Sequence, residues 1–138
     1  MPVKLTLTEG VLPKGTEQQA VARITQSFLK HHGFAGNKVM TPNVTAQIHV
    51  LPKDRTLSGG QPFSGAWVEW ILPSFAMTDR KVQQDFAAEA TAIIHELSGN
   101  KQPKDHIYVN VLHAVDGIYN FNGRAMTNAE ILETVSRG

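Results

Sequence analysis

The same order of segments occurs twice along the chain, and this duplication constrains the fold more than any other feature of the sequence. Each copy has a strand pattern, an amphipathic helix pattern and a second strand pattern. The first copy occupies about residues 2–51 and the second about residues 66–113, so equivalent segments lie roughly 62 to 66 residues apart. This order predicts two β-α-β units within one domain.

Alternation of apolar and polar side chains identifies the strands. In the first strand, Val3, Leu5 and Leu7 share one side while the residues between them are polar. The other three strand patterns begin at Val44, Ala66 and His106. Each of these four segments therefore has one face suited to a core.

Helical spacing and capping residues identify the helices. The first helix is predicted over about 17–32, after a capping-box pattern formed by Thr16 and Gln19. The second is predicted to begin at Thr78-Asp79 and to end before Gly99.

The C-terminal segment, residues 117–138, follows the second β-α-β unit. It contains the short alternating stretch IYNFNG, and then a helix pattern that Thr127 and Glu130 open as a capping box. We expect a hairpin and a short helix here.

These segments together predict an α+β fold. Right-handed crossovers place both long helices on the same face of one four-stranded mixed sheet. The residues expected on the other face are Lys4, Thr6, Thr45, Gln47, His49, Tyr108 and Asn110. This face is either exposed to water or packed against other subunits, and its aromatic neighbours favour a closed ring such as a homotrimer. A ferredoxin-like regulatory domain is an alternative architecture.

Composition excludes several classes of function. The 138 residues carry a formal net charge of +1, which provides no basic surface for nucleic acid. There is no cysteine, so disulfides, thiolate metal sites and cysteine nucleophiles are excluded. The N-terminus has no signal-peptide pattern and no segment is apolar enough to span a membrane, so we expect a cytoplasmic protein.

Pro2 is the most informative candidate for chemistry. It shares the parity of Lys4 and so belongs to the face that the helices leave uncovered. Once Met1 is removed, Pro2 carries a secondary amine, and an apolar pocket or the nearby Lys4 would lower its pKa toward neutrality. A base of this kind removes a proton at one carbon and returns it at another. If Met1 stays attached, the nitrogen of Pro2 is an amide and has no basic lone pair.

The position of Pro2, the two β-α-β units and the motif IYVN at residues 107–110 resemble the tautomerase superfamily. This group includes 4-oxalocrotonate tautomerase, macrophage migration inhibitory factor and cis-3-chloroacrylic acid dehalogenase. The resemblance covers nearly the whole chain. It implies a homotrimer with Pro2 as the base, in pockets between subunits. Tyr108 and Asn110 match residues that line the pocket from the neighbouring subunit in the migration-inhibitory-factor branch.

The C-terminal FNGR, residues 121–124, resembles a hairpin that closes the site in the dehalogenase branch. Phe121 stands where that branch has a water-activating glutamate. The paired arginines that bind carboxylate there are also missing, because PSFAMTDR offers none before Arg80. Dehalogenase or hydratase activity is therefore disfavoured, and Arg124 is the best remaining cation for a substrate carboxylate.

The other candidate residues each have a structural alternative. Lys4 is a candidate to tune Pro2 or bind carboxylate, or else to point into a polar channel. Tyr108 and Asn110 either order a substrate carbonyl or make subunit contacts. The long loop over residues 52–65 is either a lid or a set of turns. The six histidines lack the spacing of a metal site, so we predict no metal and no cofactor.

The function predicted from the sequence is proton transfer. We expect a tautomerase or isomerase acting on a small 2-oxo or 2-hydroxydienoate acid, with Pro2 as general base. Arg124, Tyr108, Asn110 and Lys4 are the predicted substrate-binding residues. The alternative is a noncatalytic trimeric binding or interaction protein on the same scaffold.

Overall fold

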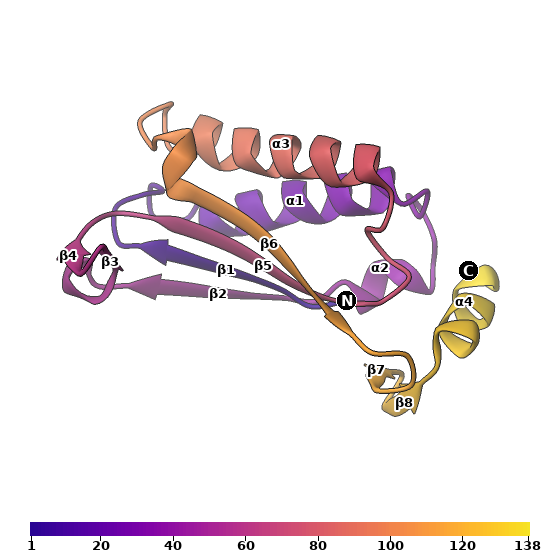
Figure 1. Cartoon of the computed structure of the whole chain (residues 1–138). Helices are drawn as coiled ribbons and strands as arrows, with labels where there is room; N and C mark the ends of the chain where they lie inside the picture. The colour runs from indigo at the N-terminus through magenta and orange to yellow at the C-terminus, as the bar shows by residue number, and fades with distance from the viewer.

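The computed structural model describes residues 1–138, and its centre is a four-stranded sheet with two long helices on one face (Figure 1). The strands of this sheet are β1 (Val3–Thr8), β2 (Ala46–Leu51), β5 (Ala66–Pro73) and β6 (Ile107–Ala114). The long helices are α1 (Glu17–His31) and α3 (Arg80–Leu97). The shorter elements are α2 (Met40–Asn43), η1 (Lys53–Arg55), β3 (Leu57–Ser58), β4 (Gln61–Pro62), η2 (Lys104–His106), β7 (Tyr119–Phe121), β8 (Arg124–Met126) and α4 (Asn128–Ser136).

The strand order is β2-β1-β5-β6. Each β-α-β unit contributes one parallel pair, β1 with β2 and β5 with β6, and the antiparallel pairing of β1 with β5 joins the two units. The predicted α+β fold with a mixed sheet is therefore confirmed. The ferredoxin-like alternative is wrong, because in that split arrangement another strand separates the two strands of a unit, whereas here they are direct neighbours.

The core lies between the sheet and the two long helices. Phe28 of α1 stacks on Trp70 of β5 with ring centroids 4.3 Å apart, and Phe86 of α3 meets Trp70 at 5.8 Å. Leu5 and Val68 are fully buried beneath the same helices. Burying each such side chain stabilises the fold by about 1.5–3 kcal/mol. This packing fixes which face of the sheet is covered and which is left open.

Two of the three predicted helix caps are present. The Asp79 carboxylate accepts the amide of Val82 at 3.1 Å at the start of α3, and the Thr127 hydroxyl accepts the amide of Glu130 at 3.2 Å at the start of α4. The capping box predicted for α1 is wrong. The hydroxyl of Thr16 instead donates to the carbonyl of Pro13 at 2.6 Å, because the turn that precedes α1 holds Thr16 in a helical conformation.

Short elements fill the connections in which no element was predicted. The amides of Val39 and Met40 donate to the side chain of Asn37 and organise α2. The loop over residues 52–65 contains η1 and the β3-β4 hairpin, whose turn uses Gly59 and Gly60 with φ of 55° and 80°. Its two glycines therefore make a hairpin turn, for which a positive φ is needed.

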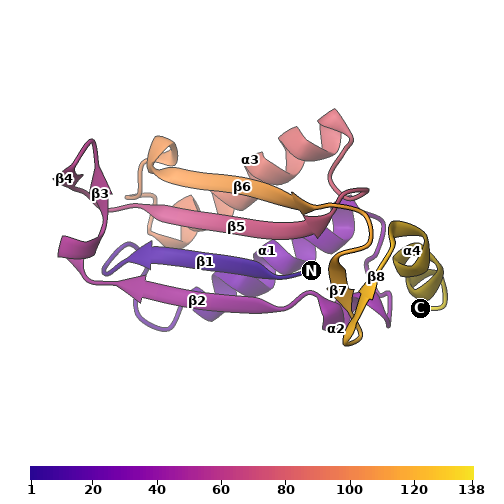
Figure 2. The ribbon, with the colours of Figure 1, turned by 60° about the horizontal axis from the view of Figure 1, so that its bottom comes forward.

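The C-terminal segment lies at the end of the sheet where the chain begins (Figure 2). The side-chain amide of Asn37 donates to the carbonyl of Val135 in α4 at 3.0 Å, and that of Asn128 donates to the hydroxyl of Ser74 at 2.8 Å. These bonds attach α4 and the β7-β8 hairpin to the rest of the chain. No helix of the structure combines the length and the apolar character needed to cross a bilayer.

Candidate active site on the uncovered face

The face of the sheet opposite α1 and α3 carries four of the five predicted site residues. Pro2 directly precedes β1 and Lys4 belongs to it, while Tyr108 and Asn110 belong to β6, which lies two strands away. The side chains of this face alternate with the buried ones that contact the helices. The single chain leaves the face open to solvent, as Figure 1 shows from the side.

Pro2 lies at the edge of this face, directly before β1. Its carbonyl accepts the amide of Ile71 at 3.1 Å, and Ile71 pairs with Leu112 of β6. The exposed fractions of Ile71 and Leu112 are 49% and 66%, so both present apolar surface to solvent. The neighbourhood of Pro2 on the open face is therefore apolar.

Met1 precedes Pro2 and is buried, with an exposed fraction of only 3%. Its amine donates to the carbonyl of Asn43 in α2, and burial lowers the pKa of this amine to about 5. In this form of the chain the nitrogen of Pro2 is an amide, so it has no basic lone pair. Periodicity in the sequence predicted neither α2 nor the Met1 contact with it, although Met1 has the same parity as the buried Val3 and Leu5.

Lys4, Glu69 and Asn110 form one row across the open face. Lys4 pairs with Glu69 in the antiparallel register of β1 and β5, and Glu69 pairs with Asn110 in the parallel register of β5 and β6. The row places Lys4 about 10 Å from Asn110, since neighbouring strands lie about 4.8 Å apart. Glu69 was not predicted as a site residue. The sequence feature that could have identified Glu69 is the presence of one acidic residue in an otherwise apolar strand, AWVEWILP.

Tyr108 belongs to a different part of the same face. Its ring stacks on Trp67 with centroids 5.8 Å apart and an interplanar angle of 22°. Tyr108 lies two strands from Pro2 and four residues before Leu112 along β6, or roughly 16 Å from Pro2. Pro2 and Tyr108 of one chain therefore do not reach a common small substrate.

Arg124, the fifth predicted residue, lies in β8 of the C-terminal hairpin. Its guanidinium is 3.6 Å from the carboxylate of Glu130, and its side chain has an exposed fraction of 70%. The hairpin is anchored by buried Tyr119 and Phe121, and burial raises the pKa of Tyr119 to about 12. The hairpin follows β6 at the end of the sheet where Pro2 lies, but the ion-pair partner of Arg124 is Glu130 of α4.

None of the four principal cavities is lined by any of the five predicted site residues. The cavity on this face, about 340 Å³ and lined by Thr6, Trp67 and Glu69 among others, does not reach Pro2, so a small ligand at Pro2 needs a covering element. A second copy of the chain placed on the open face is such an element.

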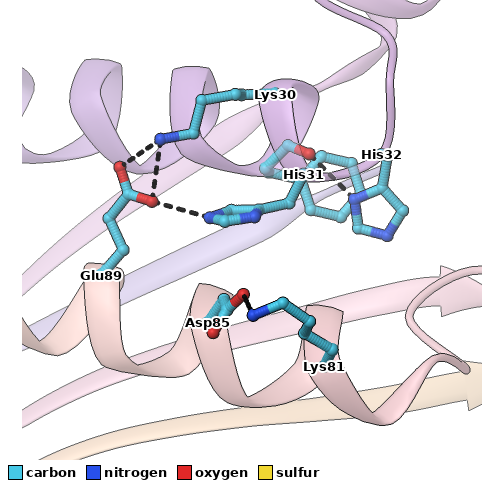
Figure 3. Close-up of polar contacts among 7 residues, drawn as sticks. Lys30, His31, His32, Lys81, Asp85 and Glu89 are labelled. Carbon is cyan, nitrogen blue, oxygen red and sulfur yellow. Dashed lines mark hydrogen bonds and ion pairs between the residues drawn. The ribbon is translucent and has the colours of Figure 1, made fainter.

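His31 and His32, next to each other at the end of α1, point in different directions (Figure 3). His31 lies 2.7 Å from the carboxylate of Glu89, while the Nδ1 of His32 lies 2.8 Å from the carbonyl of Phe28. No group of three or more His, Asp and Glu side chains is arranged to hold a metal ion.

Comparisons with solved structures identify the fold. The chain superposes on Pt0534, solved as the protein inactivated by 2-oxo-3-pentynoate, with a TM-score of 0.75 and 17% identity over 95% of this chain and 98% of that one. Native fused 4-OT matches with a TM-score of 0.74 and 14% identity, over 96% and 99%. A member of the cis-3-chloroacrylic acid dehalogenase family matches with a TM-score of 0.72 and 10% identity, over the whole of both chains.

These neighbours belong to the tautomerase superfamily, so the predicted resemblance is confirmed for the fold. The sequence itself matches no model of a protein family and no curated protein. The fold is thus established by structure, at identities of 10% to 17% for these three neighbours.

Proposed function

We propose that the chain is a tautomerase or isomerase that moves a proton on a small 2-oxo or 2-hydroxydienoate acid. The general base is the secondary amine of Pro2 after loss of Met1. The observation that carries the proposal is the position of Pro2, which directly precedes β1 on the open face of a chain with the tautomerase fold. The inactivation of the structural neighbour Pt0534 by a 2-oxo acid supports the proposed substrate class.

The surroundings of Pro2 favour an uncharged amine. Ile71 and Leu112 provide apolar surface that disfavours an ammonium ion, and Lys4 follows on the same face about 6–7 Å along the strand. A free amine with a pKa near neutrality takes a proton from the carbon beside a carbonyl and returns it at another carbon. No cofactor is needed, because the same nitrogen accepts and donates the proton.

The substrate-binding groups complete the site only in an assembly. Tyr108 and Asn110 of a neighbouring subunit would order the carbonyl end of the substrate, and Arg124 or Lys4 would bind its carboxylate. A homotrimer supplies this arrangement, and fused 4-OT is a structural neighbour that was solved as a trimer. The open face of the single chain is consistent with such a partner.

A noncatalytic trimeric binding protein on the same scaffold is the rival function. Two observations favour it: Arg124 is paired with Glu130, and the amine of the intact chain is buried against Asn43. Both proposed functions require the same homotrimer, so only a measurement of catalytic activity distinguishes them.

Intact mass and a kinetic assay provide the test. A mass lower by one methionine shows that Pro2 is free, and ketonisation of simple enol acids then measures the proposed activity. Pro2→Ala is expected to lower kcat/KM by at least 100-fold, the usual size of a general-base contribution. Pro103→Ala, at an exposed loop proline, is the matched control and is expected to leave the rate unchanged. Equal rates in the trimmed wild type and Pro2→Ala would favour the binding protein.

A further inference from the structure

The largest cavity lies at the opposite end of the sheet from Pro2, and its volume is about 690 Å³. It opens between the last residues of β1 and β2, the loop that leads from β1 to α1, and the residues that follow α3. Small-molecule sites in proteins generally have volumes of about 300–1,000 Å³. The cavity is therefore large enough for an organic ligand.

The walls of this cavity are largely apolar. Leu7, Val11 and Leu12 contribute buried side chains, and Val50 of β2 adds an apolar side chain with an exposed fraction of 48%. The only threonine in the lining, Thr8, already uses its hydroxyl with Thr56 and with the amide of Gly65. The walls therefore suit a hydrocarbon body better than a polar one.

Unpaired ammonium groups surround the cavity. Lys14 and Lys101 line it, and the chain of Lys53 passes over Gly10, where a Cβ would lie 3.8 Å from the Lys53 Cε. None of these three lysines takes part in the ion pairs of the structure. Three unpaired cations around an apolar cavity favour an anionic ligand.

Two carboxylates near the cavity offset the positive charge of these three lysines only in part. Glu17 lines the cavity, but its carboxylate accepts the amide of Gly15 at 2.8 Å. Glu9 is the one lining carboxylate that no hydrogen bond or ion pair occupies. The three lysines therefore outnumber the carboxylates, and the net local charge stays positive.

We propose that this cavity is a second binding site, separate from Pro2, for a small carboxylate with a hydrocarbon body. The hydrocarbon contacts Leu12 and Val50, and the carboxylate meets Lys14 and Lys101 at the mouth. β1 separates the cavity from Pro2 by about 20 Å, the length of its six residues. Because the cavity lies at the end of the helix layer, assembly through the open face leaves it accessible.

The first experiment locates the site with a fluorescent probe, anilinonaphthalenesulfonate, which joins an apolar body to an anionic group. Val50→Glu places a carboxylate in the wall and is expected to weaken probe binding at least tenfold. Ile48→Glu is the matched control, since Ile48 lies two residues earlier on the same side of β2, is 38% exposed and does not line the cavity. Similar loss in both variants, or in neither, would overturn the proposed location.

The second experiment tests the charge of the ligand by displacing the probe. Octanoate is expected to displace it from the wild-type protein, whereas octylammonium, which has the same number of carbon atoms, is not. Lys14→Gln with Lys101→Gln should weaken octanoate binding about tenfold, because two exposed charge pairs are lost. Lys38→Gln with Lys81→Gln removes the same charge elsewhere and is expected to leave binding unchanged.

The sign of the charge effect gives a further check. Glu9→Gln removes a repulsive carboxylate and is expected to tighten octanoate binding, while the lysine changes weaken it. Displacement by octylammonium as strong as that by octanoate would refute an anion site. Ketonisation kinetics test the Pro2 proposal and do not enter these measurements, so either proposal can fail without the other.

Discussion

At the scale of single residues, burial determines the protonation state of the N-terminal amine. The amine of Met1 is buried against Asn43, and its pKa falls from 8.0 to about 5 because an ammonium ion loses its hydration there. The same contact keeps the nitrogen of Pro2 in an amide bond. Removal of Met1 therefore exchanges a buried primary amine for a secondary amine on the open face.

The chain that retains Met1 is predicted to become more stable as the pH rises from about 5 to about 8. The unfolded amine binds a proton across this window while the folded amine does not, so the free energy of unfolding increases with pH. The expected gain is on the order of 1–3 kcal/mol. Urea unfolding at the two ends of the window measures it, and nitrogen-15 NMR of labelled Met1 reports the titration directly. A Met1 amine that titrates near its usual pKa would contradict the prediction.

Glu89 is the strongest electrostatic contact between α1 and α3 (Figure 3). Its carboxylate lies 3.0 Å and 3.1 Å from the Nζ of Lys30 and 2.7 Å from the Nε2 of His31. The hydrogen bond from Lys30 is the main cause that lowers the pKa of Glu89 from 4.5 to about 2, and the bond from His31 adds to it. This carboxylate therefore stays ionised in the folded chain well below the pH at which it is protonated in the unfolded chain.

Glu89→Gln is expected to lower the free energy of unfolding by about 1 kcal/mol at pH 6, the upper range for a partly exposed ion pair. Because the folded pKa is depressed, the contribution is complete above about pH 4.5 and is lost as the pH falls to about 2. Urea unfolding of both proteins across this range is the measurement. Glu96→Gln removes the other ion pair between these helices, to Arg23 at 2.8 Å, and serves as the comparison variant. A difference for Glu89→Gln that is constant with pH would count against the prediction.

At the scale of elements, periodicity predicted the long segments and missed the short ones. β1, β5 and both long helices have one buried side, which leaves an alternation or a helical stripe in the sequence. β2 and β6 alternate in sequence too, although most of their side chains stay exposed or half-buried in the single chain. α2 and the β3-β4 hairpin are too short to show a period. Side-chain bonds to the backbone, such as those of Asn37, determine where α2 lies. The predicted cap of α1 was wrong for a similar reason, because the hydroxyl of Thr16 bonds to the carbonyl of Pro13 in the preceding turn.

Asp79→Ala is expected to lower the free energy of unfolding by about 1 kcal/mol, because the amide of Val82 loses its acceptor at the start of α3. Asp79→Asn is expected to restore most of this loss, since asparagine also caps helices. Thr16→Ala, at a helix start with no side-chain cap, should cost no more than about 0.5 kcal/mol. Urea unfolding compares the three variants. A loss for Thr16→Ala as large as that for Asp79→Ala would restore the capping box that the structure excludes.

At the scale of the whole molecule, the open face explains why the sequence predicted the site only in part. Parity alone assigned Pro2, Lys4, Tyr108 and Asn110 to one face, and the structure confirms that assignment. Which of these residues meet around one substrate depends on how subunits pack. The sequence of one chain contains no pattern that predicts the distances between residues of different subunits. Arg124 illustrates the same limit, since its pairing with Glu130 depends on where the hairpin and α4 lie.

Mixed assemblies test whether the proposed active site is shared between subunits. Pro2→Ala lacks the base and Asn110→Ala lacks the group that orders the carbonyl, so each protein alone is expected to be nearly inactive. When the two are unfolded together in equal amounts and refolded, about a quarter of the sites in a random closed ring combine an intact Pro2 with an intact Asn110 from the neighbour. Ketonisation activity should therefore return to about a quarter of the wild-type value.

The same mixture separates a shared site from one contained in a single chain. If Pro2 and Asn110 acted within one chain, every chain in the mixture would lack one of them and no activity would return. Refolding each variant by itself controls for residual activity, and sedimentation equilibrium confirms that the mixed sample assembles as the wild type does. The two strand spacings between Pro2 and Asn110, about 10 Å, favour recovery, because a small acid held at Pro2 does not span that distance within one chain.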